Sequence, residues 1–338
     1  MTLRFAIFGA GFWSHYQLPG WLETGLVECV AVCDPDRQKA QALAEKFGVP
    51  VAYERPEDVL THEKLDFIDI CSPVETHVPL ARLALAHGLN AVCQKPLAPT
   101  LSEAEALVNE FEAAGRMLLV NENWRWQQPL RRLKERMDNR TIGRIFRAHI
   151  DYRSSFPVFD NQPFLKTLKQ FIITDIGTHI LDVARFLFGE VTELYCHTHK
   201  VRPDIAGEDA AVLLMKTVEG ASVICEMSYA SRREHDRFPE TYVDMDGEHG
   251  ALALGPDLYI RETTSAGTLI KRQSPVLKAW MNPAYGLIHE SIVPCQTNLA
   301  RALAGLEPAE TSAADNLKTL RLVYKAYESA ETGQVVRI

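Results

Sequence analysis

The 338-residue chain has no run of basic residues and no apolar run long enough to cross a membrane. It has 36 lysines and arginines and 44 aspartates and glutamates, which gives a formal net charge of −8. Nucleic acids and anionic membrane surfaces attract positive charge, so an acidic chain without a cationic stretch suits neither. We therefore expect no nucleic-acid partner and no membrane partner.

The cysteines lack the spacing of a zinc finger, and no leader-like segment is visible. There are seven cysteines, an odd number, and several lie inside apolar stretches. This is typical of buried thiols in a reducing compartment. A strand pattern begins at residue 3, so we expect no signal peptide and a cytoplasmic location.

Residues 5–14, F-A-I-F-G-A-G-F-W-S, form an apolar stretch that ends in two glycines. Gly9 suits a tight turn from a strand into a helix, and Gly11 lets the backbone approach a pyrophosphate at the helix N-terminus. Ser14 stands where close helix–strand packing requires a small residue. The motif alone is compatible with a turn that binds no nucleotide.

A second apolar strand, residues 27–33, is followed by Asp34, 25 residues after Gly9. A carboxylate at this place can accept hydrogen bonds from both hydroxyls of an adenosine ribose, which predicts a dinucleotide cofactor. Asp34 would repel a 2′-phosphate and so favours NAD, although Arg37 nearby could serve a phosphate. The structural alternative is that residues 34–36 form only a turn and a helix cap.

Strand and helix patterns alternate up to about residue 123. Strands are predicted at 27–33, 51–53, 67–71, 90–93 and 117–120, and helices at 37–47, 78–87 and 101–114, the last with a capping box at Ser102 and Glu105. Such alternation with short connections indicates an α/β fold, a Rossmann-type doubly wound parallel sheet. Ligands bind beyond the carboxyl ends of its strands. We therefore expect the cofactor to contact Gly9, Gly11, Phe12, Trp13, Asp34, Ser72, Pro73, His77, Gln94 and Lys95, with His77 equally compatible with a solvated or capping residue.

A different pattern follows. A basic amphipathic helix at 129–137 precedes strands at 143–152, 191–199, 210–217, 221–229 and 241–245, a long loop at 156–168, a helix at 312–331 and a last strand at 335–336. Consecutive strands with short turns indicate a large open, mainly antiparallel sheet with one face available for a partner. We predict two domains: residues 1–123 bind NAD, and residues 124–338 form an α+β domain for substrate binding and oligomerisation.

Two places carry candidate catalytic chemistry. Lys95 lies at a strand end, where an ammonium group can stabilise negative charge on a substrate oxygen. Asp175, His179 and Asp182 lie at i, i+4 and i+7, on one face of a predicted helix. That face is compatible with a general acid–base histidine oriented by Asp175, with a metal site of a hydrolase or lyase, or with a capped helix and a buried structural histidine. The dinucleotide motif upstream favours the first interpretation, without a metal.

The motifs together resemble the Gfo/Idh/MocA oxidoreductases, the relatives of glucose–fructose oxidoreductase and inositol 2-dehydrogenase. The matching motifs are G-A-G-x-x-S from Gly9, A-V-C-D from Ala31, I-C-S-P-x-x-T-H from Ile70, K-P-L-A from Lys95 and D-I-G-T-H-x-x-D from Asp175.

The resemblance implies a catalytic set of Lys95, Asp175 and His179 and the oxidation of a sugar or polyol hydroxyl with NAD or NADP. It also implies a homodimer or homotetramer formed through the free face of the C-terminal sheet, and often a cis bond before the motif's proline. One position departs from the pattern, because Gln94 stands where the family usually has glutamate. The amide can still bond a ribose hydroxyl, but it removes a negative charge beside Lys95.

The residues expected near the substrate are mostly polar, which suits a substrate rich in hydroxyls. They are Trp124, Arg125, Arg153, Asp160, Asn161 and Gln162, with Trp280 and Tyr285 as a flat apolar surface for a sugar ring. In the expected mechanism, His179 takes the hydroxyl proton, Asp175 orients His179, and Lys95 holds the reacting oxygen. The resemblance favours a small aldose oxidised to its lactone, with D-apiose as the specific suggestion. An inositol or another polyol, and a catalytically silent NAD-binding sensor, are the alternatives.

Overall fold

The computed structural model describes residues 2–234 and 238–338, and the chain forms two compact units. The first unit comprises Met1–Asn123, Lys278–Asn282 and His289–Lys318, and the second comprises Trp124–Leu277, Pro283–Ile288 and Thr319–Ile338. The first unit thus includes two stretches, Lys278–Asn282 and His289–Lys318, that lie far along the chain from its first 123 residues.

Close packing of two helices explains this arrangement. Helix α9 (Gly286–Leu303) lies against α1 (Ser14–Glu23) at Gly20, where an added Cβ would stand 2.4 Å from the side chain of Ile292. The amide of Gln296 also donates to the Gln17 carbonyl oxygen at 3.0 Å. Only a glycine permits this approach, and local sequence patterns do not reveal a partner about 270 residues away.

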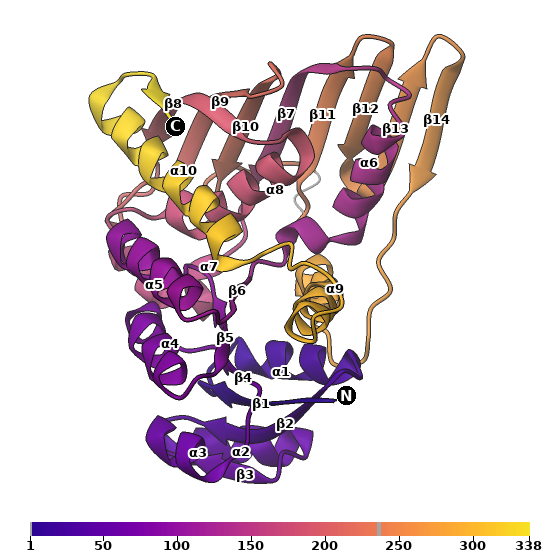
Figure 1. Cartoon of the computed structure of the whole chain (residues 1–338). Coiled ribbons are helices and arrows are strands. Elements are labelled where there is room, and N and C mark those ends of the chain that lie inside the picture. The colour runs from indigo at the N-terminus through magenta and orange to yellow at the C-terminus, as the bar shows by residue number, and fades with distance from the viewer. Residues whose placement is uncertain (1, 235–237) are drawn as a thin grey trace. The chain divides into compact units, whose positions relative to one another are not determined.

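The described residues of the first unit form a parallel sheet of six strands in the order β3-β2-β1-β4-β5-β6 (Figure 1). The strands are β1 (Leu3–Phe8), β2 (Val27–Cys33), β3 (Val51–Tyr53), β4 (Phe67–Ile70), β5 (Asn90–Gln94) and β6 (Leu118–Asn121). The chain reverses its direction of travel across the sheet between β1 and β4, and ligands bind at such a switch point. The predicted doubly wound sheet is confirmed.

The helices of this unit connect its strands. Besides α1 and α9, they are α2 (Arg37–Phe47), α3 (Pro56–His62), η1 (Val74–Thr76), α4 (His77–Ala86) and α5 (Leu101–Ala113), while α10 (Ala313–Thr332) begins here and ends in the second unit. The predicted capping box of α5 is wrong by two residues. Thr100 is the cap: its hydroxyl oxygen accepts from the Glu103 backbone N–H at 3.2 Å, because a threonine at this place satisfies an otherwise unpaired donor.

The described part of the second unit forms a mixed sheet of nine strands in the order β14-β13-β12-β11-β7-β10-β9-β8-β15. They are β7 (Ile145–Arg153), β8 (Val191–His199), β9 (Ala210–Thr217), β10 (Ser222–Ser228), β11 (Tyr242–Gly247), β12 (Gly250–Gly255), β13 (Tyr259–Thr264), β14 (Gly267–Arg272) and β15 (Val336–Arg337). The pairing is antiparallel except between β7 and β10. The open, mainly antiparallel sheet is confirmed, and β12 to β14 extend it beyond the predicted strands.

Helices α6 (Gln128–Asp138) and α8 (Thr178–Phe188) lie on the same face of the mixed sheet (Figure 1). The shorter segments are η2 (Trp124–Trp126), α7 (Val158–Asn161), η3 (Pro163–Thr167), the π-helical turn η4 (Ile173–Gly177), η5 (Pro256–Leu258) and η6 (Pro283–Tyr285). The predicted loop at 156–168 therefore contains two short helical turns.

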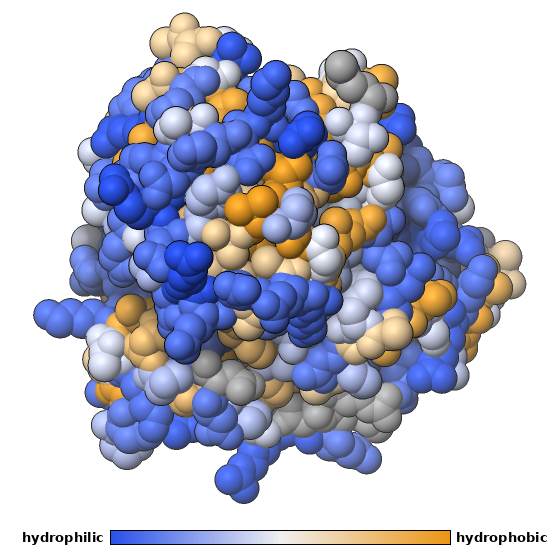
Figure 2. Space-filling model, turned by 90° about the horizontal axis from the view of Figure 1, so that it is seen from below, coloured by the Kyte–Doolittle hydropathy of each residue, from blue (hydrophilic) through white to orange (hydrophobic). Residues whose placement is uncertain are grey.

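The surface reflects the composition. Figure 2 shows that hydrophilic side chains dominate the face seen from below, with hydrophobic ones gathered near the middle of the view. Among the described residues, no helix combines the length and the apolar character that a membrane span requires.

A carboxylate lies fully buried in the centre of the parallel sheet. Asp69 on β4 accepts hydrogen bonds from the Gln17 amide at 2.8 and 2.7 Å, from the Trp21 indole at 2.9 Å and from the Asn121 amide at 3.2 Å. Burial raises the pKa of Asp69 to about 7, while these three donors act in the opposite direction. Since its amide nitrogen is committed to Asp69, Gln17 presents its oxygen to the next residue in the network.

That next residue is Gln94, whose amide nitrogen donates to Gln17 Oε1. The Gln94 oxygen in turn accepts from the backbone N–H of Lys95 at 3.2 Å. A chain of amides thus connects Asp69 to the backbone of Lys95. A glutamate at position 94, the usual residue in the family that the sequence resembles, would set an acceptor against the Gln17 oxygen.

We predict that Gln94→Glu lowers the free energy of unfolding by about 1–3 kcal/mol at pH 8, because it removes a half-buried donor from the network and adds a second negative charge near Asp69. Urea unfolding followed by circular dichroism measures the change. The matched control is Gln41→Glu on the exposed face of α2, which we expect to stay within about 0.5 kcal/mol of the parent. Equal values for the two variants would contradict the network argument.

Candidate active site

The glycine turn after β1 brings the backbone of Gly9 close to the backbone of Cys71. Gly9 has φ +107°, and a Cβ added there would stand 2.2 Å from the carbonyl oxygen of Cys71. Its carbonyl accepts the hydroxyl of Ser14 at 2.7 Å, which joins the turn to the first residue of α1. Next to Gly11 there is open space, since a Cβ added there would meet no atom within 4 Å among the described residues.

The N-terminus of α1 has the properties of an anion site. Trp13 stands at the N-cap position, but its side chain makes no capping hydrogen bond, and the first turn contains no acidic residue. The positive end of the helix dipole is therefore not neutralised by the helix itself. Phe12 is 46% exposed and Trp13 is half-buried. A pyrophosphate next to Gly11 fits this arrangement.

Asp34, at the end of β2, is held by two backbone N–H groups. Its Oδ2 accepts from Ala10 at 2.8 Å, and its Oδ1 accepts from Asp36 at 2.8 Å. Each carboxylate oxygen keeps a second lone pair for a ribose hydroxyl. The helix cap of α2 is supplied by Asp36 rather than by Asp34, and Arg37 lies 3.7 Å from a carboxylate oxygen of Glu54.

His77 differs from the expectation of a cofactor contact. Its side chain is only 1% exposed, and its Nδ1 and Nε2 each lie 2.9 Å from a carbonyl oxygen, those of Pro96 and Ser72 respectively. Burial lowers the pKa of His77. The imidazole therefore connects the loop after β4 to the turn after β5, where the bond between Lys95 and Pro96 is cis.

The other predicted contacts of this unit lie at the same ends of the strands. Ser72 is half-buried, and its hydroxyl lies 2.6 Å from that of Thr76, while Pro73 is exposed. Gln94 is occupied by Gln17 and by the backbone of Lys95, so its amide serves the protein's own network. Lys95 itself is half-buried directly after β5.

In the second unit, Asp175 and His179 lie on consecutive turns of one helical segment. Asp175 belongs to the π-helical turn, and His179 is the second residue of α8. The ring of Trp124 stacks on His179 with a centroid distance of 4.7 Å and an angle of 9° between the planes. The hydroxyl of Tyr229 donates to Asp175 Oδ2 at 3.2 Å. Burial raises the pKa of Tyr229, and the nearby Tyr152 and Asp175 add to the effect, so this hydroxyl stays protonated.

Asp182 does not share the role suggested by its helical spacing. The guanidinium of Arg125 makes a bidentate pair with it, Nε to Oδ2 at 2.7 Å and Nη2 to Oδ1 at 2.5 Å. Both side chains are buried. Arg125 is therefore held inside the protein by Asp182, which differs from the expectation that it contacts substrate. Among the described residues, no cluster of three or more His, Cys, Asp or Glu side chains suits a metal ion.

Arg153 lies on the wrong face of the mixed sheet for a substrate contact next to His179. Side chains alternate along β7, and Tyr152 packs against Trp124 with ring centroids 5.5 Å apart, on the face that α8 covers. Arg153 points to the opposite face, where it binds Asp151 at 2.7 and 2.8 Å. Tyr152 is not among the predicted site residues, although the alternation along β7 places it on the same face of the sheet as Trp124.

The remaining predicted substrate residues are scattered. Asp160 is exposed on α7, Gln162 is half-buried, and the side chain of Asn161 lies outside the described residues. Trp280 and Tyr285 belong to different units. Trp280 lines a cavity of about 540 Å³ with Phe12, His15, Tyr16 and other residues of the first unit, and Tyr285 packs on Phe156 and Phe238 in the second.

Comparison with known proteins agrees with this arrangement. The family model of the oxidoreductase family with an NAD-binding Rossmann fold, GFO_IDH_MocA, matches residues 3–122. The model of the GFO/IDH/MocA C-terminal domain matches residues 130–253. The two matches follow one another along the chain and together span most of it.

Three similar proteins cover nearly the whole chain. D-apiose dehydrogenase of Paraburkholderia graminis is 38% identical over 333 residues, which is 98% of this chain and 89% of that protein. D-apiose dehydrogenase of Rhizobium rhizogenes is 37% identical over 336 residues, 99% and 97% respectively. The crystal structure of an oxidoreductase from Agrobacterium radiobacter in complex with NAD+, L-tartaric acid and magnesium is 37% identical, has a TM-score of 0.97 and aligns over 100% of this chain and 98% of that one. The chain therefore belongs to the Gfo/Idh/MocA oxidoreductases, a family with an NAD-binding Rossmann fold.

Proposed function

We propose that this protein is an NAD-dependent dehydrogenase of a small sugar, D-apiose, which it oxidises at the anomeric carbon to the lactone. The observation that carries the proposal is the buried His179, on which the ring of Trp124 stacks and which Asp175 precedes by one helical turn. The same chain has a Rossmann unit in which Asp34 stands at the end of β2. The substrate is suggested by the two D-apiose dehydrogenases, which are 37–38% identical along nearly the full chain.

The residues of the first unit fit NAD. The open space at Gly11 and the uncapped N-terminus of α1 would hold the pyrophosphate, and Asp34 would bind the ribose hydroxyls. A 2′-phosphate would meet the fixed carboxylate of Asp34, so we propose a preference for NAD over NADP. When bound, NAD supplies the acceptor for the hydride of the carbinol carbon.

The catalytic roles follow from the chemistry of the side chains. His179 accepts the hydroxyl proton, since an imidazole exchanges protons near neutral pH. Asp175, fixed by the donor Tyr229, orients His179 and binds a neighbouring hydroxyl. Lys95 holds the reacting oxygen and offsets the negative charge that develops on it.

The two units have separate roles in this proposal. The first unit binds NAD and supplies Lys95, and the second supplies Asp175 and His179 and forms the oligomer. Tyr195, Val212 and Leu214 are 37–50% exposed on the face of the mixed sheet opposite α8, and β8 pairs with β9 at Tyr195 and Leu214. This apolar group supports a homodimer or homotetramer formed through that face. Each of the seven cysteines is free and buried, which supports a reducing cytoplasm as the location.

The deciding experiment follows absorbance of the reduced cofactor with D-apiose, other aldoses and myo-inositol, each with NAD and with NADP. We expect the largest kcat/KM with D-apiose and NAD. Reduction with inositols only would assign the protein to polyol oxidation. Binding of NAD without turnover of any compound would favour the sensor.

We predict that Lys95→Met lowers kcat/KM for the sugar by about 10²–10³-fold, because the charge on the reacting oxygen loses its counter-ion. The Kd of NAD, measured by fluorescence titration, should change little. The matched control is Lys325→Met, an exposed lysine of α10 paired with Glu328, which should keep the parental rate. A Lys95→Met enzyme with near-normal turnover would remove Lys95 from the mechanism.

A further inference from the structure

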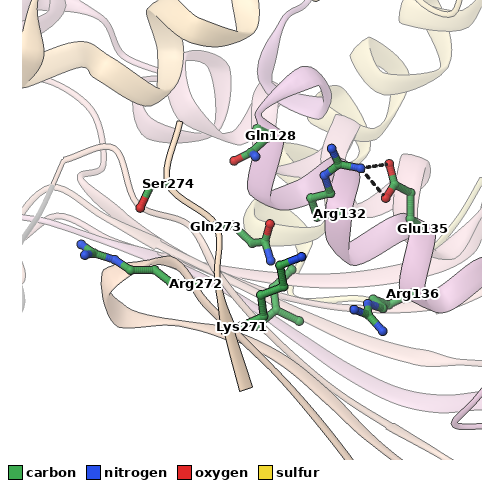
Figure 3. Close-up of a pocket in the computed structure, with 9 residues that line it drawn as sticks. Gln128, Arg132, Glu135, Arg136, Lys271, Arg272, Gln273 and Ser274 are labelled. Carbon is green, nitrogen blue, oxygen red and sulfur yellow. Dashed lines mark hydrogen bonds and ion pairs between the residues drawn. The ribbon is translucent and has the colours of Figure 1, made fainter. Parts of the chain in front are cut away.

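A second cavity, of about 540 Å³, lies within the second unit between α6 and the end of β14 (Figure 3). Helix α6 contributes Gln128, Arg132, Glu135 and Arg136, and the strand side contributes Ile260, Lys271, Arg272, Gln273 and Ser274. Its volume lies in the range of small-molecule sites. The basic helix at 129–137, which the sugar oxidation does not use, thus forms one wall of a cavity.

The periodicities of the helix and of the strand place these side chains on facing surfaces of α6 and β14. Positions 128, 132, 135 and 136 share one face of α6. Figure 3 shows Lys271 and Gln273 on the side of the strand that faces α6, while Arg272 points away. Lys271 stands opposite Ile260 in the pairing of β13 with β14, so Ile260 forms the floor below it.

The cavity carries positive charge that the protein only partly neutralises. Arg132 uses Nη1 to bind both oxygens of Glu135 at 2.8 Å, and Arg136 uses Nη1 to bind Glu262 at 3.2 Å. An arginine has five N–H donors, so both guanidinium groups retain several for a ligand. No carboxylate of the described residues pairs with Lys271. In a chain with a net charge of −8, this concentration of cations marks an anion site.

A buried amide gives an independent indication of a ligand. Gln273 is only 7% exposed, and within the described residues its side chain makes no hydrogen bond. Its side-chain nitrogen and oxygen are not among the unpartnered atoms that are shut off from solvent, so they stay accessible from the cavity. The amide lies beside the cations and offers both a donor and an acceptor, which suits hydroxyl groups next to an anionic group.

The lining also restricts the class of ligand. The residues that line the cavity include no aromatic ring and one aliphatic side chain, Ile260. No aromatic side chain of the lining is available to stack on a nucleobase. Guanidinium and ammonium groups bind phosphate, and the amide and hydroxyl groups of Gln273 and Ser274 suit a sugar. We propose that this cavity is a binding site for a phosphorylated sugar, separate in function from the proposed oxidation.

Isothermal titration with D-ribose 5-phosphate as the probe tests the site, with NAD saturating so that the dinucleotide site is filled. D-ribose, inorganic phosphate and D-gluconate are titrated at the same ionic strength. We expect D-ribose 5-phosphate to bind at least about tenfold more tightly than inorganic phosphate, and D-ribose not to bind, because charge and hydroxyls are recognised together. Tighter binding of D-gluconate would assign the cavity to sugar acids and overturn the phosphate proposal.

Lys271→Gln removes the positive charge of Lys271 and should weaken the binding of D-ribose 5-phosphate at least about tenfold. Gln273→Leu keeps the approximate volume of the side chain but removes its amide, and should weaken the binding of D-ribose 5-phosphate about threefold or more. The melting temperature of this variant is recorded to confirm that it folds. The matched control is Lys134→Gln, since Lys134 lies on α6 outside the lining and pairs with Asp138 at 2.5 Å. Absence of binding, or equal affinity in Lys271→Gln and the parent, would overturn the proposal. Sugar dehydrogenase activity is read separately, so the two proposals fail independently.

Discussion

The buried carboxylate of Asp69 constrains the centre of the Rossmann unit. A charge without solvent needs donors, and Gln17, Trp21 and Asn121 supply them from α1 and β6. Once the Gln17 nitrogen is bound, its oxygen requires a donor, which an amide at Gln94 provides and a carboxylate does not. The departure from the family's usual glutamate thus follows from a residue on another strand.

The loops at the strand ends are fixed by polar bonds as well as by packing. Asp34 binds the N–H of Ala10 and so connects the end of β2 to the glycine turn. The His77 ring lies between the carbonyl oxygens of Ser72 and Pro96 and, in its neutral form, donates to one of them, so it packs between the end of β4 and the turn that carries Lys95. Loops that bind ligands need a rigid scaffold, because a shift of about 1 Å costs affinity or rate. The buried His77 therefore helps to fix the two loops that it lies between.

The sequence predicted the parts of the fold that depend on local patterns. The doubly wound parallel sheet follows from alternation and short connections, and Asp34 was singled out by its spacing to Gly9. Contacts between distant segments could not be predicted in this way. Asp69 looked like one residue of an apolar strand, and nothing in the pattern of α9 revealed its contact with Gly20. Arg153 illustrates a different limit, since a shift of one residue along a strand exchanges the two faces of the sheet.

The pair of Arg125 and Asp182 explains how His179 is held. Burying two charges costs more free energy than an exposed pair, and removing one partner leaves the other without compensation. The pair therefore holds η2, the turn that carries Arg125, against α8, the helix that carries Asp182. Trp124 precedes Arg125 and stacks on His179, so the same pair places the indole on the imidazole. Asp182 is occupied in this way, so the helical spacing that it shares with Asp175 and His179 does not give the three side chains one role.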